Sequence, residues 1–570
     1  MEYGPTLPIS QYIHATKYRN KNENFYEAMC RIAGALADGE EHRLQLKDIL
    51  LDMRFMPAGR VQAAVGSVRQ VTPYNCFVSG VIEDNMRSIM QKADEAAFTM
   101  KLGGGIGYDF SRLRPRGSPI STLDSGSSGP VSFMDIYNSV CKTVVSAGNR
   151  RGAQMGVLRV DHPDIEEFIN VKQDLTRLNY FNVSVGVTDE FMLALQADAD
   201  FDLRFEGKKH RTVRAAALWE NIMRNTWDYA EPGVLFLDTI NDYNNLYYCE
   251  KIAATNPCSE QPLGPYGACL LGSFNLVKYL YRPTDTVDNV SPSGFVKVNQ
   301  FDYEKFRHDI THVVRAMDNV INNAKYPLPE QRDEAISKRR MGLGITGLAN
   351  AGTIMGLHYN REAFLEFEKR VLTVLRDTAY MSSVDLSIEK GVFKLFNPDK
   401  YLGSKFIHTL PDSLKSQIYQ YGIRNSHLLS IAPTGTISLC ADNISSGIEP
   451  PYRYVIDRTI HKEHGLEVER VEDYAYRLGY KGVTADMAEA QDHLNVLLTA
   501  APLVDSSVSK TCNVGSNVSW GDFKDLYFKA WKGKAKGLTT FRDAGKRVGI
   551  LQEVEGACYY DPETGNRSCE

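Results

Sequence analysis

The sequence predicts an α/β protein, because strand-like and helix-like stretches alternate through most of its 570 residues. Short β-rich runs occur at 180–187 ("YFNVSVGV"), 233–240 ("GVLFLDTI") and 427–438 ("HLLSIAPTGTIS"). Stretches with apolar residues at helical spacing alternate with them, at 302–325, 361–390 and 484–500. Strands separated by helices favour parallel βα units, and the sequence has no short repeat of the kind that indicates a solenoid or a propeller.

The two ends of the chain differ from this central pattern. Apolar and charged residues alternate at helical spacing over 22–53, so residues 1–60 are expected to form a small helical region that ends at "RFMPAGR". The mixed pattern then continues over 61–547. The polar segment 548–570 is expected to be a flexible tail, and 283–299 an exposed loop or hairpin.

Composition and charge exclude several classes of protein. A chain that is 43% hydrophobic and 24% charged is typical of globular proteins, not of disordered or fibrous ones. The net charge of −5 gives no general attraction for nucleic acid. We find no signal peptide and no run of roughly 18 apolar residues, so we expect a cytoplasmic protein without membrane contact. Ten scattered cysteines are too few for a secreted disulfide scaffold, which leaves catalytic, redox or metal-binding roles.

The stretch "NPCSEQPLGPYGACLLGSFNL" (256–276) is the first candidate site. An isolated cysteine is usually a small buried hydrophobe, but Cys258 follows a turn set by Pro257 and has Asn256 and Glu260 beside it. A buried carboxylate and carboxamide need partners, which a hydroxylated ligand can supply. The motif has no histidine or lysine to make a thiolate, although a base from elsewhere in the fold stays open. The other interpretation of Cys258 is a radical role, in which a neutral thiol gives up a hydrogen atom.

Other motifs have two interpretations each. "APTGTIS" (432–438) predicts either a phosphate-holding helix start or a simple helix cap, with equal weight. "KLGGGIGYDF" (101–110) is no Walker A loop and indicates glycines that allow a close backbone approach. "GNRRGAQMG" (148–156) is either an anion-contacting loop or a surface turn, and "HKEHG" (461–465) is expected on a solvated helix face. The pair Cys558 and Cys569 fits no standard zinc spacing and favours a mobile dithiol.

Taken together and in order, these motifs resemble the large catalytic subunit of ribonucleotide reductases over about residues 20–570. The matching stretches are "NCFVSGVIEDNMRSI" (75–89), "GGGIGYDFSRLRPRGSPI" (103–120), "SGPVSFMDIYNSV" (128–140), "RRGAQMGVLRVDHPDIEEFI" (150–169), "NPCSEQPLGPYGACLLGSFNL", "RRMGLGITGLA" (339–349), "APTGTIS" and "SSGIEPPY" (445–452). The amino-acid sequences of 150–169 and of "NPCSEQPL" most resemble those of class II, the adenosylcobalamin-dependent enzymes.

The resemblance implies a ten-stranded α/β barrel with a central finger loop that carries Cys258 at its tip. Cys258 would become a thiyl radical and take the 3′ hydrogen of a ribonucleotide. Glu260 would act as base on the 3′ hydroxyl and assist loss of the 2′ hydroxyl as water, while Asn256 would bind the ribose. Cys76 and Cys269 would deliver two electrons and close to a disulfide, which requires Cα atoms about 4.4–6.8 Å apart.

The resemblance also implies partners for other segments. Cys558 and Cys569 in the tail would reduce the disulfide and be reset by thioredoxin or glutaredoxin. The substrate, a ribonucleoside di- or triphosphate, would be held by its phosphates at Pro433, Thr434, Gly435, Thr436, Ile437 and Ser438. The segment at about 80–160 would bind a deoxynucleotide effector through Asp84, Arg114, Arg150, Arg151 and Gln154. The N-terminal region does not match the family's ATP-cone domain, so control at such a domain is expected to be missing.

Two alternatives stay open. "GLTTFRDAG" (537–545) has Phe541 and no tyrosine where class I subunits have a tyrosine pair, which favours adenosylcobalamin as the radical source. The adjacent Tyr559 and Tyr560 keep open a class I-like subunit that binds no cofactor directly and depends on a ferritin-like partner. A non-catalytic, redox-sensing nucleotide-binding protein is the remote alternative, because it would not need Asn256 and Glu260 around a third cysteine. No metal ligands are predicted among the side chains, and a homodimer stays open.

Overall fold

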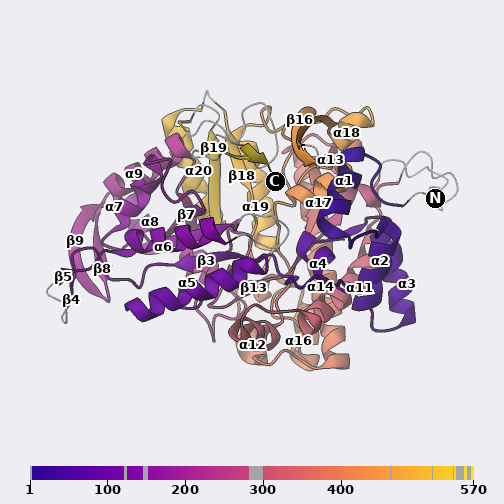
Figure 1. Ribbon diagram of the computed structural model, residues 1–570, viewed down its shortest axis with the longest axis horizontal. Coiled ribbons are helices and arrows are strands. Elements are labelled where there is room, and N and C mark those ends of the chain that lie inside the picture. The colour runs from indigo at the N-terminus through magenta and orange to yellow at the C-terminus, as the bar shows by residue number, and fades with distance from the viewer. Residues whose placement is uncertain are drawn as a thin grey trace.

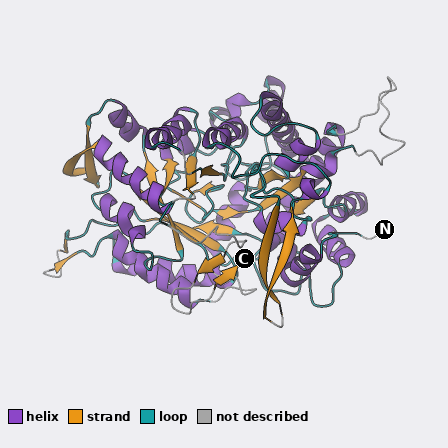
Figure 2. Ribbon diagram, turned by 90° about the horizontal axis from the view of Figure 1, so that it is seen from above, coloured by secondary structure: helices purple, strands orange, loops and turns teal. Residues whose placement is uncertain are grey.

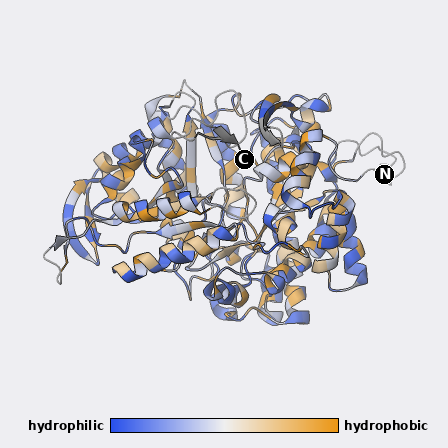
Figure 3. Ribbon diagram, viewed as in Figure 1, coloured by the Kyte–Doolittle hydropathy of each residue, from blue (hydrophilic) through white to orange (hydrophobic). Residues whose placement is uncertain are grey.

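The computed structural model describes residues 3–120, 125–144, 152–281, 300–462, 465–515, 518–542, 545–546, 558–560 and 567–569. The strands of the two larger sheets lie in the interior, and helices surround them on several sides, whereas short hairpins such as that of β8 (Asp200–Phe205) and β9 (Lys208–Arg214) lie at the periphery (Figures 1 and 2). Hydrophobic and hydrophilic residues occur on the same outer helices, as expected for helices that bury one face (Figure 3). The expected loop at 283–299 and most of the tail lie outside the described residues.

An eight-stranded sheet carries most of the motifs. Its order is β13 (Ala268–Cys269), β2 (Cys76–Val78), β3 (Gly105–Asp109), β6 (Gln154–Arg159), β7 (Phe181–Val187), β10 (Gly233–Phe236), β19 (Gly537–Arg542) and β18 (Thr511–Val514). The strands from β2 to β10 are parallel, whereas β13 and β19 run antiparallel to their neighbours β2 and β10. Helices connect the parallel strands, among them α5 (Met86–Lys101), α6 (Pro130–Thr143), α8 (Asp189–Gln196) and α9 (Ala215–Tyr229). The predicted parallel βα units are thus confirmed.

A second sheet has three strands. Strand β14 (Leu271–Asn275) pairs antiparallel with β1 (Phe55–Pro57) and parallel with β15 (Gly342–Thr346). Single parallel bridges, Leu343 to Leu429 and Ile431 to Val508, continue beyond β15. Over the described ranges no ladder closes the two sheets into a barrel. The predicted α/β class is confirmed, but the ladders do not establish ten strands.

Two long predicted helices are confirmed and four other predictions need correction. The helices α11 (Tyr303–Asn323) and α14 (Glu362–Lys390) match 302–325 and 361–390, whereas α19 (Ala490–Ala500) begins later than 484. The run 233–240 divides into β10 and α10 (Leu237–Asp242), and the run 427–438 forms single bridges at Leu429 and Ile431 before helix α17 (Gly435–Cys440) begins. The predicted helix at "HKEHG" is wrong: β16 (Val455–Lys462) and β17 (Gly465–Glu472) form an antiparallel hairpin there. Their β-branched residues, Val455, Ile456, Val468 and Val471 among them, favour strands.

The remaining helices complete the layer around the strands. They are α1 (Pro8–Tyr18), α2 (Phe25–Leu36), α3 (Glu40–Leu51), α4 (Gly59–Ala64), α7 (Ile165–Asn170), α12 (Pro329–Lys338), α13 (Leu348–Ile354), α15 (Pro398–Leu402), α16 (Asp412–Tyr421), α17 (Gly435–Cys440), α18 (Tyr474–Arg477) and α20 (Trp520–Lys532). Strand β8 (Asp200–Phe205), which buries Phe201 and Leu203, and the mostly exposed β9 (Lys208–Arg214) form a hairpin outside the main sheets.

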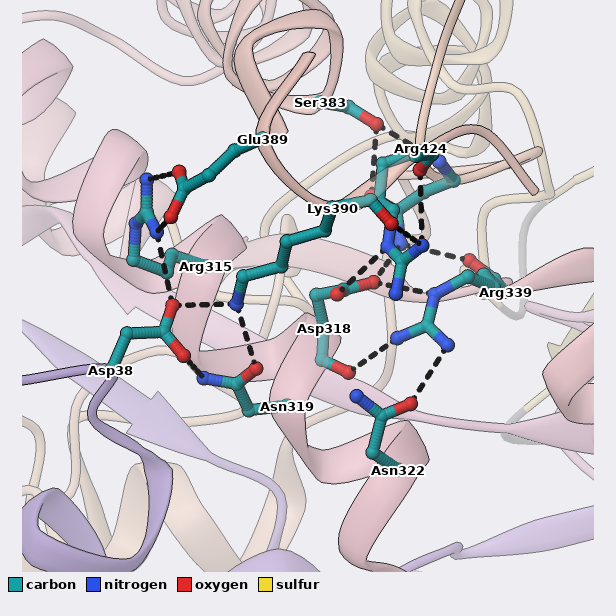
Figure 4. A network of polar contacts seen from close by, with 12 residues as sticks. Asp38, Arg315, Asp318, Asn319, Asn322, Arg339, Ser383, Glu389, Lys390 and Arg424 are labelled. Atoms are coloured by element: carbon teal, nitrogen blue, oxygen red, sulfur yellow. Dashed lines mark hydrogen bonds and ion pairs between the residues drawn. The ribbon is translucent and has the colours of Figure 1, made fainter. Parts of the chain in front are cut away.

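A network of charged side chains attaches the N-terminal helices to α11 and α14 (Figure 4). Asp38, between α2 and α3, accepts hydrogen bonds from Arg315 (3.0 Å) and Asn319 (2.8 Å) on α11 and from Lys390 (2.5 Å) on α14. Partial burial of the Asp38 carboxyl opposes its ionisation, but the hydrogen bonds from Lys390, Arg315 and Asn319 outweigh this and lower its pKa to about 2. The contact is therefore made by the ionised form.

We expect Asp38→Asn to lower the free energy of unfolding at pH 7 by about 1–2 kcal/mol, after allowance for solvent screening. Because the folded-state pKa lies below the unfolded value of about 3.9, this stabilisation is present above pH 4 and is lost as the pH falls toward 2. Urea denaturation at pH 7 and at pH 3 measures the effect. Glu40→Gln, at a fully exposed carboxyl that pairs with Arg43 one turn along the same helix, is the control and should change little. Equal stability of Asp38→Asn and the wild type at pH 7 would contradict the assignment.

Candidate functional site

The stretch around Cys258 forms a narrow hairpin. Strands β11 (Ala254–Thr255) and β12 (Pro262–Leu263) pair antiparallel, and β11 packs against β3 and β6 of the large sheet. At the tip, the Asn256 N–H donates to the Gln261 carbonyl (3.2 Å) and the Ser259 N–H donates to the Asn256 carbonyl (3.0 Å). Ser259 has a left-handed φ of 64°. The predicted turn at "NPC" is confirmed, and we call residues 254–263 the finger loop.

The finger loop touches the sheet where glycines leave room. A Cβ atom on Gly107 would lie 1.8 Å from the carbonyl oxygen of Thr255, a distance that no side chain can occupy. A Cβ atom on Gly105 would lie 3.2 Å from the ring of Pro257 and 3.3 Å from Sγ of Cys76. The interpretation of "KLGGGIGYDF" as glycines that allow a close backbone approach is therefore confirmed.

We expect Gly107→Ala to lower the free energy of unfolding by roughly 1–3 kcal/mol, because either β3 or the finger loop must move away. Urea denaturation measures this loss. Gly34→Ala on α2 is the matched control, since no atom lies within 4 Å of the added methyl group, and it should be neutral or slightly stabilising. Similar stabilities of the two variants would mean that the contact with Thr255 does not constrain the loop.

Cys258 is exposed at one side of a cavity of about 580 Å³. The cavity lies among β6, β7, β10, β19, the finger loop and the segments that precede β16 and β18. The finger loop is held at its wall because Nδ2 of Asn182 donates to the carbonyl oxygen of Pro257 (3.1 Å). A ligand in the cavity can therefore reach the thiol of Cys258.

Asn256 and Glu260 are both buried beside this thiol. Oδ1 of Asn256 accepts from the Gln261 N–H (2.9 Å) and the Thr255 hydroxyl (3.2 Å), whereas Nδ2 of Asn256 and Oε2 of Glu260 have no hydrogen-bond partner among the described residues. Burial raises the pKa of Glu260 to about 7, although the Asn256 amide partly opposes the rise. A carboxyl that is half ionised near neutral pH suits proton transfer.

Sequence reasoning missed three residues around Glu260, of which two bond its main chain and one is buried next to it in the chain. The carbonyl oxygen of Glu260 accepts from the Ser430 hydroxyl (2.8 Å) and the Ser507 N–H (3.0 Å). The Gln261 side chain is fully buried, and neither end of its amide has a hydrogen-bond partner in the described part of the chain. Only its place three residues after a cysteine flanked by polar groups could have drawn attention to Gln261, whereas no sequence signal marks Ser430 or Ser507.

Cys76 and Cys269 lie directly opposite each other on β2 and β13. Opposed residues of an antiparallel pair have Cα atoms about 4.5–5.5 Å apart, within the range that a disulfide needs. Both residues are thiols in this structure. Burial raises the pKa of Cys269 well above its usual range, and the charges of Glu260, Cys76 and Cys258 raise it further. The structure thus brings the three cysteines and Glu260 into one neighbourhood.

The residues predicted to bind phosphate surround the start of α17. Thr434 has a left-handed φ of 54°, its hydroxyl accepts from the Gly447 N–H (2.8 Å), and its carbonyl accepts from the Ser438 hydroxyl (2.5 Å). Both hydroxyls thus serve the protein itself. The N–H groups of Gly435, Thr436 and Ile437 lie in the first helical turn, which leaves them for a ligand. Pro433 lines the same cavity as Cys258.

The predicted effector residues have other partners in this structure. Asp84 and Arg114 form an ion pair (2.6 Å) with each other, and the Arg114 N–H also donates to Asp84 (3.0 Å). Gln154 is buried, where its amide accepts from the Tyr108 hydroxyl (2.9 Å) and donates to the Tyr137 carbonyl (3.3 Å). Arg150 and Arg151 lie outside the described residues. The effector role of this segment stays a prediction.

The tail contributes one observation. Strands β20 (Cys558–Tyr560) and β21 (Arg567–Cys569) pair antiparallel, with Cys558 opposite Cys569, and the rest of 548–570 lies outside the described residues. Across the described ranges, no group of three or more His, Cys, Asp or Glu side chains is arranged to hold a metal ion. No helix in the described part is long and apolar enough to span a membrane.

Comparison with known proteins gives a consistent result. Residues 74–541 match the family described as ribonucleotide reductase, barrel domain. The chain is 33% identical over 539 residues to the vitamin B12-dependent ribonucleoside-diphosphate reductase of Mycobacterium tuberculosis (strain CDC 1551 / Oshkosh), covering 87% of this chain and 72% of the relative. The enzyme of the same name from Thermoplasma acidophilum is 33% identical, over 84% and 62% of the two chains. The vitamin B12-dependent ribonucleotide reductase of Streptomyces coelicolor is 28% identical, over 89% and 60%.

Proposed function

The chain belongs to the ribonucleotide reductases, and from this premise we propose that it uses Cys258 to reduce ribonucleotides to 2′-deoxyribonucleotides with a cobalamin cofactor. The observation that supports this most is the position of Cys258 at the tip of the finger loop, exposed to a cavity, with Glu260 buried beside it. Neither a class I-like subunit nor a redox sensor accounts as well for this arrangement together with cobalamin-dependent relatives.

In the proposed reaction, Cys258 accepts the 3′ hydrogen atom of the substrate and later returns it. Glu260, with its pKa of about 7, takes the proton of the 3′ hydroxyl while the 2′ hydroxyl leaves as water, and Asn256 orients the ribose. Cys76 and Cys269 supply the two electrons and two protons that balance the reaction, and their two thiols become one disulfide. Their opposed positions on β2 and β13 support this role.

The side chains that line the cavity around Cys258 support cobalamin as the cofactor. Tyr452 and Phe541 offer aromatic surface, and the exposed Thr539 offers a hydroxyl group, which suits contact with part of a flat ring system that carries amide side chains. When bound, adenosylcobalamin supplies the radical that Cys258 requires, and the adenosyl form is part of our proposal. Phe541 on β19, in place of a tyrosine, supports a radical source that needs no protein tyrosine pair.

Finer features of the family complete the proposal. The bridges from Leu343 to Leu429 and from Ile431 to Val508 support a ten-stranded barrel made of both sheets. We assign residues 1–60 to an N-terminal helical region, 61–547 to the barrel and 548–570 to a redox tail. The N–H groups at 435–437 would hold the substrate phosphates. Cys558 and Cys569 would carry electrons from thioredoxin or glutaredoxin, and a deoxynucleotide would bind at 80–160. The enzyme would act in the cytoplasm, and its assembly as a monomer or a homodimer is left to measurement.

The proposal is tested by adding adenosylcobalamin alone to the purified chain with a ribonucleotide, a deoxynucleotide effector and a small dithiol. We expect deoxyribonucleotide to form without any second subunit. Product that forms only after a ferritin-like subunit is added would favour the class I-like alternative. Nucleotide binding without product under either radical source would favour the redox-sensing protein.

A further inference from the structure

A buried ion pair lies in the wall of the cavity that exposes Cys258. Lys510, just before β18, has a side chain with 0% exposure, and its ammonium donates to Oε2 of Glu449 (2.5 Å). The other carboxylate oxygen of Glu449 accepts from the Thr511 N–H (2.8 Å). Both Lys510 and Glu449 line the cavity, and the Glu449 side chain is 22% exposed there. Glu449 therefore presents a carboxylate that is held at both oxygens.

The other groups around Lys510 do not replace Glu449 as its counter-ion. Glu368 on α14 is fully buried, neither of its carboxyl oxygens has a hydrogen-bond partner in the described part of the chain, and burial raises its pKa well above the usual range. Burial thus favours the neutral form of Glu368. Nδ1 of His493 lies 3.0 Å from the Lys510 ammonium, and burial together with the Lys510 charge lowers the His493 pKa to about 2. His493 is therefore neutral, and the carboxylate of Glu449 is the charge that balances Lys510.

A pair so placed is more than a structural contact. Removing two charges from water costs free energy that a buried pair only partly recovers, so the pair is a poor way to stabilise a cavity wall. Its partial exposure instead leaves the carboxylate of Glu449 available to hydrogen-bond donors in the cavity. A carboxylate repels phosphate groups, so the matching part of a ligand carries hydroxyl or N–H donors.

We propose that Glu449 is a specificity-determining residue that accepts a hydrogen bond from an O–H or N–H group of the ligand in this cavity, and that Lys510 is the positioning residue that fixes its carboxylate. The inference rests on the proposed function, which places nucleotide and cobalamin in the cavity. Both ligands carry suitable donors: ribose hydroxyls and base amino groups on the nucleotide, and amide groups on the cobalamin. Separate binding measurements distinguish the two sources.

The experiment compares Glu449→Gln, Lys510→Met and the double variant. The double variant removes both charges, so it leaves no unpaired buried ion and is expected to fold even where Glu449→Gln or Lys510→Met alone is destabilised. Affinity for a ribonucleoside diphosphate is measured by calorimetry without cofactor, and affinity for adenosylcobalamin by its absorbance change on binding. Lys536→Met is the matched control, because Lys536 is also buried but donates to the carbonyls of Asp505 and Ser506 and does not line the cavity.

We expect Glu449→Gln to weaken one of the two ligands by about 10-fold or more, as the loss of a hydrogen bond to a charged acceptor does. Lys510→Met should weaken the same ligand, and the double variant should bind it no worse than Glu449→Gln, because Lys510 acts through Glu449. Lys536→Met should lower the melting temperature without changing either affinity.

Two results would overturn the inference. One is a double variant that binds both ligands within twofold of the wild type. The other is a Lys510→Met effect that is as large in the Glu449→Gln background as in the wild type, because Lys510 would then contact the ligand itself. Wild-type binding is measured apart from turnover, so failure of this inference and failure of the proposed reaction give different results.

Discussion

Replacing Cys258 by serine is expected to reduce deoxyribonucleotide formation below detection while nucleotide affinity stays within about twofold of the wild type. Serine has nearly the shape of cysteine, and Cys258 is exposed at the cavity, so the change disturbs no packing. A hydroxyl does not give up its hydrogen atom as a thiol does, and the reaction loses its first step. Product is measured by chromatography, and nucleotide binding by calorimetry.

The control for this experiment is Cys249→Ser. Cys249 is also exposed but does not line the cavity, so this variant should keep full activity. If Cys258→Ser still formed product at a measurable fraction of the wild-type rate, Cys258 would not be the residue that takes the hydrogen atom.

Replacing Glu260 by glutamine has the second largest expected effect, a loss of about 10²–10⁴-fold in turnover, as for the removal of a general base. In the wild type the base must be ionised, so the rate should rise with pH through about 7 and then level off. In Glu260→Gln this rise should disappear. Rates at saturating nucleotide between pH 5.5 and pH 8.5 test both expectations, because the wild-type profile should follow the titration of a single group.

The same substitution should act on stability in the opposite direction. Burial raises the folded-state pKa of Glu260 above its unfolded value of about 4.3, so ionisation weakens the fold as the pH rises from about 4 to about 7. Glu260→Gln removes this effect, and the variant should be at least as stable as the wild type at pH 8. A pH profile unchanged by the substitution, or a clear loss of stability at pH 8, would mean that Glu260 supports the fold and not the reaction.

Local sequence patterns predicted the parts of this protein that depend on neighbouring residues. The turn at Pro257 follows from its fixed φ, and the helices at 302–325 and 361–390 follow from long apolar periodicity. The run 233–240 is too short to distinguish a strand from a strand followed by a helix. The two histidines of "HKEHG" are spaced as on one face of a helix, but the segment contains the end of β16 and the start of β17. The antiparallel pairing of these strands, and not the local spacing, determines its structure.

The features that give the site its chemistry depend on distant parts of the chain. The register that sets Cys76 opposite Cys269 comes from the pairing of β2 with β13, which no spacing reveals, and only the family resemblance pointed to it. The pKa of Glu260 depends on burial by segments near Ser430 and Ser507. The stretch "SSGIEPPY" contains Glu449, but nothing in the sequence pairs it with Lys510, because single charged residues are usually solvated.

The position of β13 has a mechanical consequence. This strand is only two residues long and forms one edge of the eight-stranded sheet, and one residue further along the chain β14 begins, the central strand of the three-stranded sheet. The carbonyl oxygen of Leu270, between the two strands, accepts from the Gly342 N–H (2.7 Å). A thiol pair and a disulfide differ in sulfur separation, so closing the proposed disulfide requires a small adjustment of the backbone. Because Cys269 is fully buried where the two sheets meet, we expect that adjustment to be transmitted to both of them.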